Sequence, residues 1–128
     1  MSNTSVEIDF SKIKILIVED DIIAQMALTK MLQEMGFTNI LKENNYESSL
    51  SSFHKESPDL VILDIYLKGE KTGIDLAKVI SSKIIYISAS SDSQTMREVE
   101  KTDYKYFLNK PYNFVQIEKT IKKVLRGV

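Results

Sequence analysis

Short apolar runs alternate along the chain with longer segments in which apolar residues recur at helical spacing. The runs at 13–18, 60–63 and 84–87 are apolar at nearly every position. This pattern is typical of parallel strands that are buried on both faces. Weaker strands are predicted over 37–42 and 104–108.

The segments between these strands are predicted to be helices because their apolar residues fall on one helical face. The first helix ends at Gly36. Its methionines, Met26, Met31 and Met35, are interpreted as core-filling side chains. The other helices are predicted over 46–53, 74–80, 92–102 and 114–125. The helix at 92–102 nearly lacks apolar residues, so we expect it to be the most weakly packed element.

The regular alternation of strands and helices, with short connections, predicts the fold class. It favours a parallel α/β sheet with right-handed crossovers and helices on both faces, a doubly wound arrangement. In such sheets, ligands bind beyond the carboxyl ends of the strands. Residues 1–11 are interpreted as a polar N-terminal tail, and residues 12–128 as a single domain.

Composition narrows the function classes. The chain has 128 residues, and its 17 basic and 18 acidic residues give a formal charge of −1. This balance argues against non-specific binding to nucleic acid or to an anionic membrane. The absence of cysteine excludes disulfides, thiolate metal sites and cysteine nucleophiles. The apolar runs are too short to span a bilayer, and the polar N-terminus resembles no secretory signal, so we expect a soluble cytoplasmic domain.

Polar residues follow several of the predicted strands directly. They are Glu19, Asp20 and Asp21 after the first strand, Asp64 after the third, Ser88 after the fourth and Lys110 after the fifth. Because the carboxyl ends of parallel strands share one edge, these residues are expected to meet. Crowded carboxylates either bind a cation or acquire raised pKa values, and an all-oxygen ligand set selects Mg²⁺ or Mn²⁺.

A carboxylate beside a metal, a lysine and a hydroxyl is an arrangement for phosphoryl transfer. Asp64 would be the nucleophile and form an acyl phosphate, while Lys110 and Ser88 would interact with the phosphoryl oxygens. Asp21 is more simply interpreted as the N-cap of the first helix. His54 is interpreted as an ordinary surface residue.

Four segments together resemble the receiver domain of two-component response regulators. They are residues 17–21 (Ile-Val-Glu-Asp-Asp), 61–65 (Val-Ile-Leu-Asp-Ile), 87–89 (Ile-Ser-Ala) and 107–111 (Phe-Leu-Asn-Lys-Pro). The resemblance covers about residues 12–126. It implies a flavodoxin-like receiver fold with five parallel strands in the order 2-1-3-4-5.

The resemblance also implies a role for each site residue. Asp64 would accept a phosphoryl group from a histidine kinase or a histidine phosphotransfer protein. The implied Mg²⁺ ligands are Glu19, Asp20, Asp64 and the backbone carbonyl of Tyr66. Lys110 would pair with the phosphoryl group, Ser88 would be the switch hydroxyl and Phe107 the switch aromatic. The Lys110–Pro111 peptide bond is expected to be cis.

A receiver domain is a regulatory phosphoacceptor and not a true enzyme, although it assists its own phosphorylation and dephosphorylation. The implied output surface is formed by the helix at 92–102, the strand at 104–108 and the last helix. Its partner would be an unknown downstream protein or output domain, and a homodimer that forms on phosphorylation is a further candidate. No direct contact with nucleic acid or membrane is expected.

The sequence departs from the receiver pattern in several places. Lys68 stands where the family often has proline, and Phe107 replaces the commoner tyrosine. Tyr106 occupies a position often held by glycine. The loop from Asp64 to Gly73 looks about one residue longer than usual, and the third helix with its connection to the fourth strand looks shorter.

Three alternatives remain open at this point. A flavodoxin-like FMN-binding protein shares the topology, but acidic residues after the first strand would repel its phosphate. A phosphatase with an aspartyl nucleophile would need a second acid two residues after Asp64, where Tyr66 stands. The third alternative is a receiver-shaped interaction module that is never phosphorylated.

Overall fold

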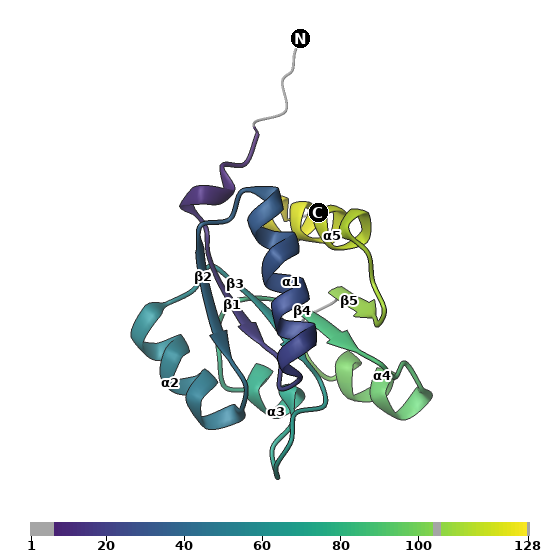
Figure 1. Cartoon of the computed structure of the whole chain (residues 1–128). Coiled ribbons are helices and arrows are strands. Elements are labelled where there is room, and N and C mark those ends of the chain that lie inside the picture. Colours follow the sequence, from purple (N-terminus) through teal and green to yellow (C-terminus); the bar gives the residue numbers. More distant parts are fainter. Residues whose placement is uncertain (1–6, 104–105, 128) are drawn as a thin grey trace.

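The computed structural model describes residues 7–103 and 106–127, and its centre is one parallel sheet of five strands (Figure 1). The strands are β1 (Lys14–Val18), β2 (Asn39–Glu43), β3 (Leu60–Asp64), β4 (Lys83–Ser88) and β5 (Tyr106–Asn109). Their order in the sheet is β2-β1-β3-β4-β5, which confirms the predicted topology. The first two residues of the predicted strand at 104–108 lie outside the described residues.

Helices cover both faces of this sheet, as Figure 1 shows. They are α1 (Ile22–Met35), α2 (Tyr46–Glu56), α3 (Gly73–Ala77), α4 (Ser93–Glu100) and α5 (Phe114–Arg126), with a 3-10 turn, η1 (Phe10–Lys12), before β1. Helices α1 and α5 contribute to one apolar cluster, and α3 and α4 contribute to the other. Side chains of α2 pack against the second cluster.

Successive side chains along each central strand point alternately into the two apolar clusters. In β1, Ile15 and Ile17 face the α1–α5 side, whereas Leu16 and Val18 face the α3–α4 side. All four side chains are fully buried. Because helices cover both faces of the sheet, nearly every residue of the central strands is apolar in the sequence.

The ends of α1 and α3 can be compared with those predicted from the sequence. Gly36 adopts a left-handed conformation (φ 112°) and caps α1, as the sequence predicts. Helix α3 ends at Ala77, three residues before the predicted end. Ile80 is nevertheless buried, so its side chain contributes to the core from the connection that follows α3 and not from the helix.

Two interpretations of apolar residues need revision. Met26 is 65% exposed, so it does not fill the core, although Met31 and Met35 do pack against it. Phe10 lies within the predicted polar tail, yet it is buried and its ring stacks on Phe37 with centroids 4.6 Å apart. Within the described residues, no helix combines the length and apolar character needed to cross a bilayer.

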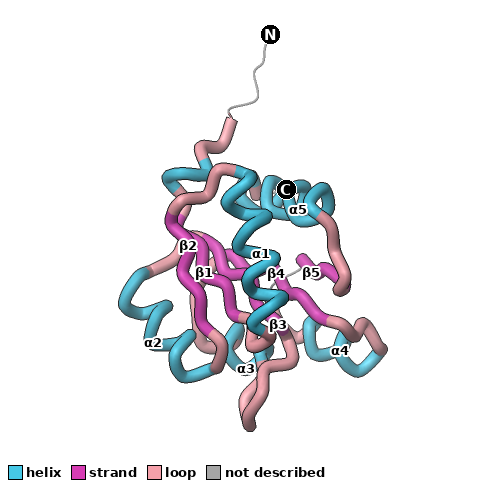
Figure 2. The backbone as a smooth tube through the Cα atoms, in the orientation of Figure 1, coloured by secondary structure: helices cyan, strands magenta, loops and turns pink. Residues whose placement is uncertain are grey.

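The fold brings one loop close to the carboxyl ends of the strands. Residues 65–72 connect β3 to α3, and in Figure 2 this pink connection extends beyond the sheet at the lower edge of the molecule. The end of β1 lies beside the end of β3, since Val18 pairs with Leu63, and Asp64 pairs with Ile87 of β4. Residues just beyond these positions therefore share one rim.

Candidate functional site

Three consecutive acids follow β1, and each has a different partner. Glu19 is almost completely buried, and its Oε1 lies 2.5 Å from Lys110 Nζ. Asp20 Oδ2 accepts a hydrogen bond from the Lys68 backbone N–H at 2.7 Å. Asp21 caps α1 by accepting from two backbone N–H groups of its first turn, which confirms the N-cap interpretation. The Asp21 carboxylate is thus occupied by the N-terminus of α1. The carboxylates of Glu19 and Asp20 lie close to that of Asp64 at the carboxyl ends of the strands.

Asp64 ends the central strand and is held by two donors. Its Oδ2 lies 2.8 Å from Lys110 Nζ, and its Oδ1 accepts a hydrogen bond from the Tyr66 backbone N–H at 2.9 Å. Only 7% of the Asp64 side chain and 23% of the Lys110 side chain is exposed. The Lys110 backbone N–H donates to the Ser88 carbonyl at 2.8 Å, which positions the lysine at the end of β4. The Lys110–Pro111 peptide bond is cis, as predicted.

Burial and close charges shift the pKa values of this cluster. Burial raises the pKa of Glu19 to about 7, the neighbouring Asp64 adds to the rise and Lys110 opposes it. Burial by itself lowers the pKa of Lys110, but hydrogen bonds to Asp64 and Glu19 outweigh it, so the pKa is raised above its ordinary value. Lys110 therefore stays protonated and offsets the negative charge of the two carboxylates.

The acidic residues also meet the requirements of a cation site. Glu19, Asp20 and Asp64 each offer an oxygen, and these oxygens lie within 4.8 Å of one another. A ligand set of oxygens alone is the type that binds hard divalent cations such as Mg²⁺. The donor chemistry of this rim thus fits the ion expected from the sequence.

Ser88 and Phe107 lie on neighbouring strands beside this rim. Ser88 is fully buried, and its Oγ accepts a hydrogen bond from the Ser90 N–H at 3.1 Å. Phe107 is partly buried against the cluster that contains Tyr86 and Val99. Phe107 therefore packs on the same cluster as a residue of α4.

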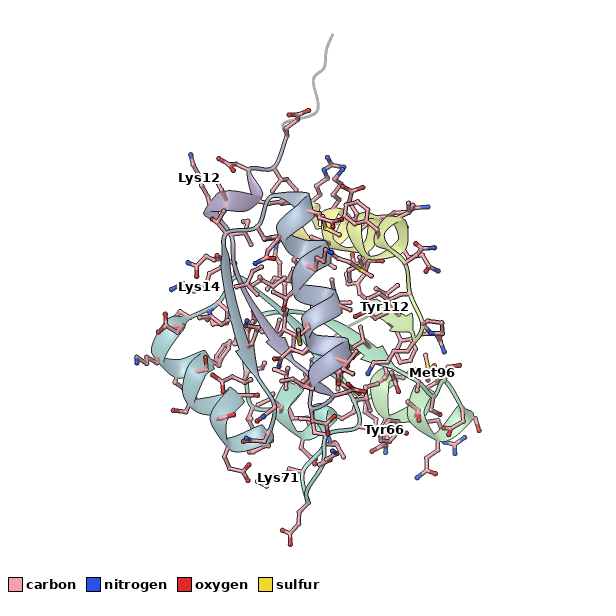
Figure 3. The ribbon with its side chains drawn as sticks, in the orientation of Figure 1. Lys12, Lys14, Tyr66, Lys71, Met96 and Tyr112 are labelled. Carbon is pink, nitrogen blue, oxygen red and sulfur yellow. The ribbon has the colours of Figure 1, made fainter. Side chains whose placement is uncertain are left out.

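The side-chain contacts of Gln25 and Tyr66 had no signal in the sequence. The side chain of Gln25 is buried and donates to the backbone carbonyls of Glu19 and Glu43, both at 3.1 Å, so it ties the ends of β1 and β2 together. Tyr66 reaches from its loop to α4, where its hydroxyl forms a hydrogen bond with Thr95; Figure 3 shows Tyr66 on the side of the loop that faces α4. These contacts depend on three-dimensional packing that spacing does not reveal.

Gly73 had a weaker signal, as a glycine at the start of a predicted helix. A Cβ at this position would lie 2.1 Å from the backbone oxygen of Asp64. Helix α3 can pack directly against the end of β3 because residue 73 has no side chain. Gly73 therefore supports the position of Asp64.

A family model described as the response regulator receiver domain matches residues 15–122. The chain belongs to this family. The receiver domain is 36% identical over 117 residues to the sensory transduction protein LytR of Staphylococcus haemolyticus, an alignment that covers 87% of this chain and 44% of LytR. It spans about half the length of such curated relatives.

Other relatives of the receiver domain have nearly its own length. It is 28% identical over 117 residues to the chemotaxis protein CheY of Bacillus subtilis, covering 88% of this chain and 97% of CheY. A solved two-component response regulator from Clostridium difficile superimposes with a TM-score of 0.81 and 25% identity, covering 90% of this chain and 97% of that one. These matches favour the receiver interpretation over the FMN-binding and phosphatase alternatives.

Proposed function

We propose that Asp64 of this receiver domain accepts a phosphoryl group from a histidine kinase or a histidine phosphotransfer protein. One observation carries the proposal: Lys110 Nζ lies 2.8 Å from Asp64 Oδ2 and 2.5 Å from Glu19 Oε1. The ammonium is thus already beside the carboxylate at which a phosphoryl group would add negative charge.

The two oxygens of Asp64 suggest which one reacts. Oδ1 accepts the Tyr66 backbone N–H, whereas Oδ2 lies 2.8 Å from the Lys110 ammonium, the group that would pair with a phosphoryl oxygen. We assign Oδ2 as the nucleophile. It attacks phosphorus, the phosphorus–nitrogen bond to the donor histidine breaks with its electron pair going to nitrogen, and an acyl phosphate forms. Lys110 then pairs with a phosphoryl oxygen.

Glu19, Asp20, Asp64 and the backbone carbonyl of Tyr66 are the proposed Mg²⁺ ligands, supported by the 4.8 Å cluster of acidic oxygens. When bound, the ion would neutralise charge on the phosphoryl oxygens during transfer. The same side chains would assist both the addition of the phosphoryl group to Asp64 and its removal by water. The domain would therefore assist its own phosphorylation by small donors and its own dephosphorylation. It would remain a regulatory domain and not a turnover enzyme.

Ser88, Phe107 and α4 are the proposed path to the output surface. The Ser88 hydroxyl would leave the Ser90 N–H and donate to the phosphoryl group. Phe107 would fill the space that Ser88 leaves, and because Phe107 packs on the cluster that holds Val99, α4 would shift with it. The face of α4, β5 and α5 would then bind a downstream protein, an output domain or a second copy of the domain.

The phosphodonor is proposed to dock over α1. Three exposed apolar side chains, Ile22, Ile23 and Met26, lie in the first turns of α1, directly after the acidic residues. A groove of about 360 Å³ separates α1 from Lys110 and Tyr112. A donor helix on this face would bring its phosphohistidine to the rim from the solvent side. Since such donors act in the cytoplasm, we place the receiver domain there as well.

The test is phosphorylation by acetyl phosphate in the presence of Mg²⁺, followed by intact-protein mass spectrometry. The wild-type domain should gain the mass of one phosphoryl group, and Asp64→Asn should gain none. Asp59→Asn is the matched control, because Asp59 directly precedes β3 at its opposite end. Equal labelling of wild type and Asp64→Asn would refute the assignment. No labelling of wild type, and no binding of beryllofluoride with Mg²⁺, would favour the module that is never phosphorylated.

A further inference from the structure

A backbone hydrogen bond joins the loop after β3 to one of the proposed Mg²⁺ ligands. The Lys68 N–H donates to Asp20 Oδ2 at 2.7 Å, across 48 residues of sequence. This distance is at the short end of the range for N–H groups that donate to carboxylates, where the charge strengthens the bond. The contact uses the backbone of Lys68, so it does not depend on the lysine side chain.

The structure around Lys68 fixes the direction of its N–H group. Leu67, the preceding residue, is buried in the α3–α4 cluster. Gly69, the following residue, has a φ of 110°, a conformation that side chains other than glycine rarely adopt. Two residues further on, the Lys71 ammonium lies 4.7 Å from the centre of the Tyr46 ring in α2. The loop is thus anchored on both sides of Lys68.

The Asp20 carboxylate, in contrast, has little else to hold it. Across residues 7–103 and 106–127, the Lys68 N–H is its one hydrogen-bond donor. Its neighbours in sequence have other partners, since Glu19 pairs with Lys110 and Asp21 caps α1. Without the Lys68 N–H, the partly buried Asp20 side chain would have more rotamers available and would lose more rotamer entropy when it binds an ion.

A single N–H donor leaves most of the acceptor capacity of the carboxylate unused. An ionised carboxylate has about four lone-pair sites, so Asp20 can accept one N–H and still coordinate a cation. Hydrogen bonds to metal ligands from groups that do not touch the metal fix the orientation of those ligands, and their loss typically weakens metal binding by about 10- to 100-fold.

We propose that the backbone N–H of Lys68 positions the Asp20 carboxylate for Mg²⁺ binding. Lys68 is thereby a positioning residue that acts through its main chain. This inference rests on the proposed function in one respect, namely that Asp20 is a Mg²⁺ ligand. Any residue except proline supplies the required donor at position 68.

The experiment compares Mg²⁺ affinity among loop variants of the unphosphorylated domain, by magnesium titration of its amide resonances. Lys68→Pro, which removes the N–H, should bind Mg²⁺ about tenfold more weakly than wild type. Lys68→Ala keeps the N–H and should bind like wild type. Glu70→Pro places the same ring at an exposed position of the same loop and should also bind like wild type. Wild-type affinity in Lys68→Pro, or equal losses in all three variants, would overturn the proposal.

A metal-free measurement separates this inference from the proposed function. The Lys68 amide should exchange slowly with solvent in the wild type and faster in Asp20→Ala, which lacks the acceptor. A Lys68 amide that exchanges at the unprotected rate overturns the inference, whatever the Mg²⁺ affinity. A protected Lys68 amide in a wild-type domain that binds no Mg²⁺ would instead refute the metal site, and the role of the N–H with it.

Discussion

The Tyr66 hydroxyl forms a hydrogen bond with the Thr95 hydroxyl and thereby joins the loop after β3 to α4. Tyr66 follows Asp64 by two residues and is half-exposed, whereas Thr95 is buried. At the other end of α4, the buried Tyr86 donates its hydroxyl to Thr102 at 3.0 Å. Helix α4 is therefore held at both ends by pairs of hydroxyl groups.

Removing the Tyr66 hydroxyl should loosen α4 without unfolding the domain. A hydrogen bond contributes on the order of 1 kcal/mol, so in Tyr66→Phe the amides of residues 93–100 should exchange about fivefold faster. Thr95→Ser keeps a hydroxyl and should change exchange much less. Amides of α5 serve as an internal reference. Unchanged exchange in α4 of Tyr66→Phe would show that the hydrogen bond does not hold the helix.

Lowering the pH should weaken the start of α4, because Asp92, the N-cap residue of this helix, becomes protonated. The Thr95 backbone N–H, followed by the Ser90 hydroxyl, holds the pKa of Asp92 below its ordinary value of 3.8. Because the folded pKa is below the unfolded pKa, ionised Asp92 stabilises α4 above the unfolded value, and this contribution is lost as pH falls through the folded pKa. The protection of α4 amides against hydrogen exchange, corrected for intrinsic exchange, should therefore fall relative to that of α5 amides as the pH drops below the ordinary pKa of Asp92.

Asp92→Asn is the matched control for this titration. Asparagine also caps helices but does not ionise. In this variant the protection of α4 relative to α5 should not vary over the same pH range. The same acid response in Asp92→Asn and wild type would assign the effect to another group.

A methyl group at position 73 should displace the proposed phosphoacceptor. The Cβ of Gly73→Ala would meet the Asp64 backbone oxygen at 2.1 Å, so backbone must move. We expect a loss of about 3 kcal/mol in the free energy of unfolding and slower phosphorylation by acetyl phosphate. Gly69→Ala introduces only an unfavourable φ, with open space around its Cβ, and should cost about 1 kcal/mol. Equal stability losses in the two variants would contradict the clash.

Removing the ammonium group of Lys110 should destabilise the fold. In Lys110→Met, the carboxylates of Glu19 and Asp64 remain close together and buried without their cation. We expect the free energy of unfolding, measured with urea, to fall by about 3 kcal/mol. Adding Asp64→Asn to this variant should recover part of the loss, because it removes a buried charge that has lost its partner. No recovery in the double variant would mean that the unpaired charge of Asp64 is not the cause.

The stacked pair at the N-terminus should contribute to stability. Phe10→Ala would remove a buried ring that packs on Phe37, and we expect a loss of about 3 kcal/mol. Lys12→Ala, an exposed change two residues away, is the control and should have little effect. If the two variants were equally stable, the folded domain would begin close to the predicted boundary at residue 12.

The features that the sequence predicted well are those with a repeating pattern or a rule of topology. Continuous apolar runs predicted the central strands because both faces of the sheet are covered. The topology rule for parallel sheets predicted that Glu19, Asp64 and Lys110 would meet, although 46 and 91 residues separate the lysine from its two partners. Asp21 was predicted as an N-cap from its residue type and position alone.

Contacts made by single residues were not predictable. Phe10 is one aromatic residue in a polar stretch, so no period marks it as buried. Ile80 fits the apolar spacing of the predicted helix but lies in the connection that follows α3. The N–H of Lys68 and the hydroxyl of Tyr66 act through directions that depend on the loop conformation, and sequence spacing holds no information about that conformation.

The hydroxyl pairs at the ends of α4 have a consequence for how its opening would depend on temperature. Exposing apolar surface raises the heat capacity, and exposing polar surface lowers it. Detaching α4 would expose the buried side chain of Val99 together with the hydroxyls of Thr95 and Thr102, so the polar contribution would offset part of the apolar one. The van't Hoff plot for the detached helix should then be less curved than that for unfolding of the whole domain. Such a helix would be a signalling element whose enthalpy of opening varies less between cold and warm conditions than the enthalpy of unfolding the domain.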